Sequence, residues 1–152
     1  MTTELKPSDK WKIIPWRKLR KIVFRLQVRI FKAQKNGNPR LVRRLQKLLL
    51  SSRAAKLLAI RQVTQLNMGR KTAGVDGKKA LETAQRLALF EELVKNWKQW
   101  KHESLKRVWI PKADGTKRGL GIPTIADRAY QCLLKYALEP ATEAIFNANS
   151  FG

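Results

Sequence analysis

One segment of this chain constrains its fold more than any other, because it has the pattern of a β-hairpin. Residues 107–122, RVWIPKADGTKRGLGI, place strand-forming residues on both sides of an Asp-Gly pair, which is a preferred hairpin turn. Gly119 and Gly121 alternate in the second strand, where a missing side chain lets another group lie close to the backbone. We therefore expect one hairpin with something packed against its glycines.

Helical patterns fill most of the remaining chain. Thr124 is a good N-cap, with Asp127 three residues later as in a capping box, and Glu139 and Pro140 are expected to break the helix that follows. Apolar residues at spacings of three and four predict helices over 15–36, from Asn38 onward, from a cap at Ser51 or Ser52 to Gly69, and over 79–100, 125–138 and 141–146. The sequence thus predicts a mainly α protein with one β-hairpin, of the α+β class.

Positive charge is the main compositional feature. Lysine and arginine total 33 against 11 acidic residues, a formal net charge of +22, and no aspartate or glutamate occurs from Lys10 to Val75. Like charges at helical spacing destabilise an isolated helix by about 0.2–0.5 kcal/mol per pair, and ordinary solvated faces mix signs. We therefore favour a nucleic-acid surface over a plain solvated face. Its candidate residues form one row on each of the first two expected helices: Arg17, Lys21, Arg25 and Arg29, then Arg40, Arg43, Arg44 and Lys47.

The acidic residues do not suggest a catalytic centre. Two-metal phosphoryl transfer needs at least two converging carboxylates, and the 11 acidic residues are scattered over turns, helix ends and one amphipathic helix. We expect no catalytic residue, no metal site and no cofactor in this chain. His102 and Cys132 are the single histidine and cysteine, and we expect both to be structural.

A membrane role is a weaker interpretation of the first basic helix. Such a helix can lie on an anionic bilayer, but the following helices offer its apolar face a partner. No apolar run reaches the roughly 18 residues that a spanning helix needs. The start, MTTELKPSDK, lacks the apolar core of a signal peptide. We expect no membrane partner and a location in the cytoplasm of a bacterium or the interior of an organelle.

Several motifs in a fixed order carry a family resemblance. IPKADGTKRGLGIP, then TIADRAYQCLLKYALEPATEAIF, then NSFG, is similar to the fingers region of group II intron reverse transcriptases and maturases. Upstream, NMGRKTAGVDG resembles the N-terminal turn motif of that family, so the likeness covers roughly residues 57–152. A small departure is Gly119, where many members have proline. The resemblance implies a flexible N-terminus over 1–14, a basic helical N-terminal extension over 15–77, and a linking helix, fingers hairpin and following helices over 78–152.

The resemblance also implies roles for individual residues. Lys112 and Arg118 match the lysine and arginine that bind the triphosphate of the incoming nucleotide, for which an ammonium and a guanidinium fork are suited. An alternative is that they are exposed cations that discourage edge aggregation. Arg70 and Lys71 match a loop that lies near template and primer, where basic side chains suit phosphate contacts.

Three functions follow as expectations. The chain resembles the N-terminal and fingers part of an RNA-directed DNA polymerase that stops before the palm, whose aspartates hold two Mg²⁺ ions. We expect it to bind RNA, either a group II intron or a template and primer, and to synthesise nothing alone. The alternatives are a stand-alone RNA-binding module that assists intron folding or splicing in trans, and one half of a split enzyme completed by a separately encoded palm and thumb.

Overall fold

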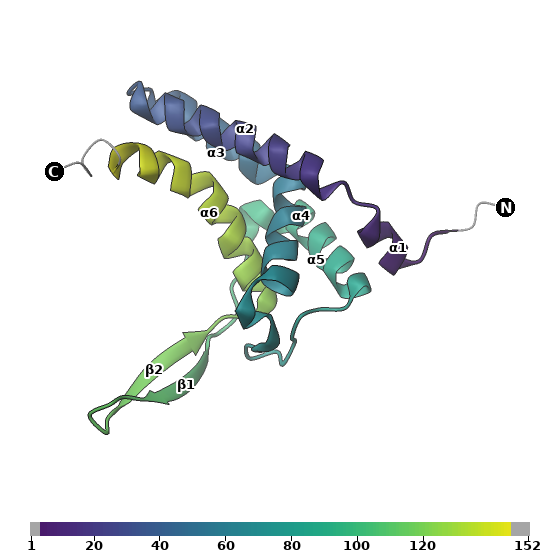
Figure 1. The fold of residues 1–152 in the computed structure, drawn as a ribbon, viewed down its shortest axis with the longest axis vertical. Coiled ribbons are helices and arrows are strands. Elements are labelled where there is room, and N and C mark those ends of the chain that lie inside the picture. The colour runs from purple at the N-terminus through teal and green to yellow at the C-terminus, as the bar shows by residue number, and fades with distance from the viewer. Residues whose placement is uncertain (1–3, 147–152) are drawn as a thin grey trace.

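A computed structural model describes residues 4–146 as a body of helices from which one β-hairpin projects (Figure 1). The predicted mainly α fold with one hairpin is confirmed. Three short segments have other helical geometry: η1 (Gln62–Leu66) is a π-helical turn, and η2 (Met68–Lys71) and η3 (Trp97–Gln99) are 3-10 turns. The regular elements are α1 (Pro7–Lys12), α2 (Trp16–Lys35), α3 (Pro39–Ser51), α4 (Arg53–Arg61), α5 (Thr83–Asn96), β1 (Lys106–Pro111), β2 (Lys117–Ile122) and α6 (Ile125–Phe146).

Local signals set most helix ends. Gly37 has a φ of 67° and reverses the chain between α2 and α3, a conformation that glycine adopts at little cost. The side chains of Asn38 and Ser52 accept hydrogen bonds from the backbone nitrogens three residues later and so cap α3 and α4. The predicted cap at Thr124 is also confirmed, because its hydroxyl accepts from the backbone nitrogen of Asp127 at 3.1 Å.

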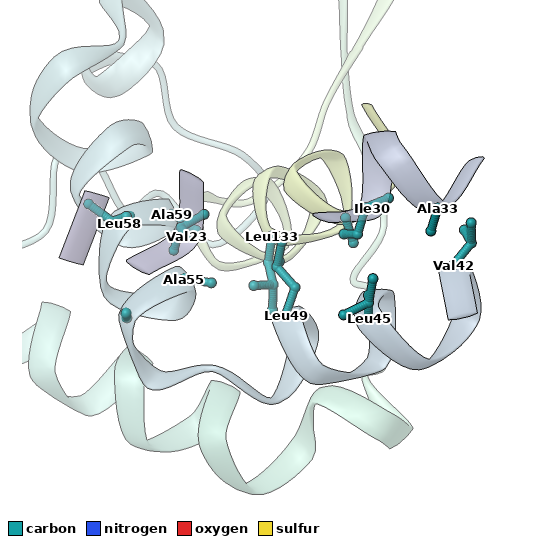
Figure 2. Packing of buried hydrophobic residues seen from close by; sticks show 12 residues of the cluster. Val23, Ile30, Ala33, Val42, Leu45, Leu49, Ala55, Leu58, Ala59 and Leu133 are labelled. Carbon is teal, nitrogen blue, oxygen red and sulfur yellow. The ribbon is translucent and has the colours of Figure 1, made fainter. Parts of the chain in front are cut away.

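The hydrophobic core has two joined parts. In the first, α2 and α3 pack against α4 and α6, and Figure 2 shows their side chains meeting between the helices. The second part lies at the other end of α4, where α1, α5 and the first turns of α6 meet. Because α4 and α6 contribute to both parts, they connect the basic N-terminal helices to the segment that carries the hairpin.

The N-terminal segment that we expected to be flexible contains a helix, α1. Trp11 of this helix is 5% exposed and belongs to the second part of the core. Its indole nitrogen donates to the side-chain oxygen of Gln65 at 3.1 Å. A large aromatic side chain with a satisfied polar atom fixes a short segment well, so α1 is held by packing that no local pattern reveals.

The expected helix break at Pro140 is wrong, because α6 continues through Pro140 to Phe146. A proline inside a helix has no N–H and leaves the carbonyl four residues earlier without its usual partner. That carbonyl belongs to Tyr136, and it accepts a hydrogen bond from the side chain of Gln27 in α2. The next carbonyl, of Ala137, accepts from Gln46 in α3. Two neighbouring helices thus satisfy the backbone that the proline disturbs.

Helix α5 is shorter than the predicted range of 79–100. Ala80 has a φ of 32°, outside the helical region, so the helix starts only at Thr83. Glu82 and Gln85 form a reciprocal capping box at this start. Leu81 precedes the helix and is nevertheless buried. Its burial explains why the apolar spacing predicted a helix that starts before Thr83.

Candidate nucleic-acid interface

The first row of cations lies on α2, and all four side chains are exposed. Residues four apart on an α-helix are rotated by about 40° relative to each other, so the row winds around α2 instead of following one line. As a result, Arg17 and Lys21 line one groove, beside α4. Arg25 and Arg29 line another of about 450 Å³, beside the end of α3. The expectation of a single row is therefore corrected to two neighbouring basic sites.

The second row lies on α3, where Arg40, Arg43, Arg44 and Lys47 are likewise exposed. Leu48 of the same helix lines the groove that holds Arg25 and Arg29. Arg44 lies one helical turn before Leu48, on the same side of α3. From α3, Leu48 and Ser51 line this groove, and the cations of the second row lie outside it.

In the part of the chain that the structure describes, these cations form no salt bridges. Within residues 4–146, no lysine or arginine forms a salt bridge with a carboxylate, and the one close contact between a basic side chain and a carboxylate joins His102 to Asp127 at 3.4 Å. Exposed like charges without counter-charges repel each other. An anionic partner would relieve this repulsion, so the surface of α2 and α3 has the electrostatics of a phosphate-binding site.

The hairpin carries the second predicted site. Its strands pair with Ile110 opposite Arg118, and the backbone nitrogen of Lys112 donates to the carbonyl of Thr116 at 2.7 Å. Because side chains alternate between the two faces of a strand, Lys112 and Arg118 lie on the same face as diagonal neighbours. Both are exposed, and the hairpin extends away from α2 and α3 (Figure 1). The structure therefore brings these two cations together and separates them from the helical rows.

The glycines of β2 are covered by side chains of the hairpin segment itself. The ring of Trp109 lies 3.3 Å from where a Cβ on Gly119 would be, and the side chain of Leu105 lies 2.7 Å from the corresponding point on Gly121. The group expected against these glycines is thus internal. Trp109 remains 59% exposed, with the guanidinium of Arg107 at 5.7 Å from its ring.

The loop that contains Arg70 and Lys71 is held by a residue that the sequence analysis missed, Arg128 of α6. Its guanidinium donates to the carbonyl of Gly69 at 2.9 Å and to the carbonyl of Thr72. Its Nε donates to the carbonyl of Pro123 at 3.0 Å. Arg128 therefore joins this loop to the end of the hairpin segment. The only signal in the sequence was a charged residue in the first turn of a mostly apolar helix.

The two predicted cations of this loop, Arg70 and Lys71, differ in exposure. Lys71 is exposed, whereas Arg70 is half-buried and donates to the carbonyl of Asn67 at 3.2 Å. The backbone carbonyl of Arg70 accepts from Ala80 at 2.7 Å. Arg70 therefore helps to shape the loop, and Lys71 is the cation that it presents.

Asp127 has a structural role. It is 2% exposed, and its carboxylate accepts from the indole of Trp100 at 2.9 Å and from the backbone nitrogen of Glu103 at 3.0 Å. These bonds anchor the segment that leads into β1. The carboxylate therefore does not complete the capping box with Thr124 that the spacing suggested.

The remaining reactive groups do not form a site. Burial raises the pKa of the Cys132 thiol, which keeps it protonated and poorly nucleophilic. Within residues 4–146, no group of three or more histidine, cysteine, aspartate or glutamate side chains is arranged to hold a metal ion. In the same range, no helix has the length and apolar character needed to cross a membrane.

Fold and surface define a class: a basic, mainly α domain that carries one β-hairpin on a charged helical body. The model of one family, the N-terminal domain of reverse transcriptase, matches residues 11–93, more than half of the chain. The chain belongs to this family. The match begins at Trp11 in α1 and ends at Leu93 in α5, and so includes both cation rows and the loop around Arg70.

Curated relatives agree with this assignment. Maturase-like protein 1 of Euglena gracilis is 42% identical over 137 residues, which cover 90% of this chain. The protein of the same name in Euglena longa is 32% identical over 139 residues, or 91% of the chain. Protein YkfC of Escherichia coli (strain K12) is 34% identical over 113 residues, or 72% of the chain. In each case the chain spans 30% of the relative's length, and it corresponds to an N-terminal reverse transcriptase or maturase region.

Proposed function

We propose that this chain is the RNA-binding N-terminal and fingers part of a group II intron reverse transcriptase or maturase. The observation that carries the proposal is the exposed cationic surface of α2 and α3, where no lysine or arginine forms a salt bridge with a carboxylate of residues 4–146. Phosphate contacts by lysine and arginine supply most of the affinity of such surfaces for nucleic acid. The RNA is an intron or a template and primer, in the cytoplasm of a bacterium or inside an organelle.

We further propose that these residues alone do not polymerise DNA. Two-metal catalysis needs carboxylates that converge on a pair of ions. The carboxylate of Asp127 accepts hydrogen bonds from Trp100 and Glu103. The carboxylate of Asp114 accepts hydrogen bonds from Thr116 in the hairpin turn. The catalytic carboxylates and their Mg²⁺ ions belong, in this proposal, to a palm domain.

Lys112 and Arg118 take part once such a palm is present. As diagonal neighbours on one face of the hairpin, they offer an ammonium and a guanidinium at neighbouring points. This pair suits a triphosphate, because the guanidinium binds two oxygens in a plane and the ammonium acts as a point charge. Their distance from α2 and α3 (Figure 1) means that they contribute little to RNA binding by the helices.

A comparison of two sets of variants tests the proposal. Reversal of four helical cations, by Arg25→Glu, Arg29→Glu, Arg43→Glu and Arg44→Glu, should weaken binding to a structured RNA far more than Lys112→Ala with Arg118→Ala. Binding is measured by electrophoretic mobility shift at low salt, with folding checked by circular dichroism. Equal losses in both sets would mean that the hairpin holds the RNA and would contradict the proposal.

A split polymerase is a second candidate function, favoured by the exposed apolar side chains of α6. Leu138, Ile145 and Phe146 are each at least half exposed, and exposed apolar patches on a helix are typical of protein interfaces. Their partner would be a separately encoded palm and thumb polypeptide. Restored primer extension on adding such a polypeptide with template and Mg²⁺ would support this function. Continued inactivity would favour a stand-alone module that assists splicing in trans.

A further inference from the structure

A groove of about 560 Å³ lies where α2 crosses α4, with η1 and α6 at its sides; we call it the α2–α4 groove. Its apolar base is formed by Val23 and Leu58, which belong to the first part of the core and are both labelled in Figure 2. Tyr136 of α6 is half-buried in it. Phe24 and Leu66 also line it and are unusually open, with 65% and 53% of their surface exposed. The groove therefore presents an aromatic and apolar surface to solvent.

Four cations also line the groove. Arg17, Arg20 and Lys21 line it from α2, and Arg61 lines it from α4. The guanidinium of Arg61 lies 4.9 Å from the ring centroid of Trp16, a stacking contact that holds it in place. No aspartate or glutamate among residues 4–146 lines the groove, although Glu139 and Glu143 line a neighbouring groove that shares Phe24 and Gln27. Its ligand should therefore combine a flat apolar part with negative charges on both sides.

We infer that the α2–α4 groove holds one unpaired nucleobase of a bound RNA, stacked on Phe24. This inference rests on the proposed RNA binding and names the part of the RNA that the site selects. The flanking phosphates lie against Arg17, Arg20 and Lys21. Single-stranded bases in loops and bulges are commonly stacked on aromatic side chains, and a volume of this size is ample for one nucleotide.

Two glutamines give the groove polar contacts for a base edge. The side-chain nitrogen of Gln27 donates to the carbonyl of Tyr136, and that of Gln62 donates to the side chain of Asn67. Both residues line the groove. With their nitrogens engaged, their side-chain oxygens remain as acceptors, which suits the N–H groups of a base.

An anionic bilayer fits this site less well than RNA. A helix that lies on a membrane must turn its apolar face to the lipid. In α2 that face is already inside the protein, because Val23, Ile30 and Ala33 are at most 4% exposed. Outside that face, Phe24 is 65% exposed and Ile22 38%, which is a small apolar surface for insertion into a bilayer.

The test uses three RNA hairpins of the same stem: one with a single bulged 2-aminopurine, one with an abasic residue in the bulge, and one fully paired. Phe24→Ala is compared with Phe146→Ala, a matched control because Phe146 is 64% exposed and lies outside the groove. Phe24→Trp is a second variant that keeps a stacking surface. Affinity and 2-aminopurine fluorescence are recorded, and thermal unfolding is measured for each variant.

The inference predicts that the unmodified chain binds the bulged base more tightly than the abasic bulge and quenches its fluorescence. Phe24→Ala should lose roughly 10-fold in affinity for the bulged RNA alone, whereas Phe24→Trp and Phe146→Ala should keep it. Equal losses on all three RNAs, or no preference for the bulged base, would overturn the inference but leave RNA binding standing. Absence of binding to all three RNAs would instead overturn the proposed function. Phe24-dependent binding to phosphatidylglycerol vesicles without bulge preference would assign the groove to lipid.

Discussion

Gln27 donates its side-chain amide to the carbonyl oxygen of Tyr136 at 3.1 Å, and this bond replaces the helical one that Pro140 cannot supply. The contact joins the basic helix α2 to α6 at the point where α6 would otherwise end. It keeps α6 continuous beneath the first part of the core, to which Leu133 and Ala137 belong. The position of the cationic surface thus depends on a polar contact as well as on apolar packing.

A double-mutant cycle on this contact gives the first prediction. Gln27→Met should lower the free energy of unfolding by about 1–2 kcal/mol, because it leaves a partly buried carbonyl without a donor. In the Pro140→Ala background the loss should be smaller, since Ala at 140 has an N–H that can bond to Tyr136. Urea denaturation of the four proteins measures the coupling. Strictly additive effects would contradict the role assigned to Gln27.

The second prediction concerns Gly74, which lies against the start of α6. A Cβ at this position would be 2.7 Å from the backbone nitrogen of Thr124, and backbone cannot move aside as a flexible side chain can. Gly74→Ala should therefore destabilise the protein by about 1–3 kcal/mol. Gly69→Ala is the control, because its nearest neighbour would be a side-chain nitrogen of Arg128 at 3.6 Å. Similar unfolding midpoints for both variants would show that the close approach does not matter.

The third prediction is a pH dependence caused by Lys56. This side chain is 1% exposed, and burial, followed by the nearby charge of Arg53, lowers the pKa of Lys56 from 10.5 to about 8. The unfolded chain therefore binds more protons between these two values, so the free energy of unfolding should rise with pH from about 8 to about 10.5. Below pH 8 the cost of burying the charge is fully present.

Lys56→Met should remove this dependence, and Lys47→Met, at an exposed position, should leave it unchanged. The measurement is the difference in urea midpoint between each variant and the unmodified protein, at pH of about 7 and about 10. Taking differences cancels other titrations, such as that of Cys132. A constant difference for Lys56→Met would mean that its ammonium keeps an ordinary pKa in the folded state.

Features with local causes could be predicted from the sequence. The hairpin follows from strand formers around Asp114 and Gly115, and Gly115 has a positive φ of 85°. The caps at Asn38, Ser52 and Thr124 follow from side chains that bond their own backbone neighbours. The NSFG motif, residues 149–152, lies outside the described residues.

Features made by distant contacts could not be predicted. The continuity of α6 depends on Gln27 and Gln46 from other helices, and α1 depends on where Trp11 packs. The two cation rows were found in the sequence, but the division of the α2 row between two grooves depends on how α2 crosses α3 and α4. The hydrogen bonds of Arg128 link α6 to the loop at Gly69, which is far away in the chain. No local pattern therefore indicates them.

The salt dependence of RNA binding tests the central claim most directly. The dissociation constant for a structured RNA should be measured between about 50 and 200 mM salt. If the surface of α2 and α3 contacts about six phosphates, affinity should fall roughly 1000-fold or more over this range, because each contact releases condensed counterions. An affinity that stays flat across the range would contradict the claim that this cationic surface binds RNA.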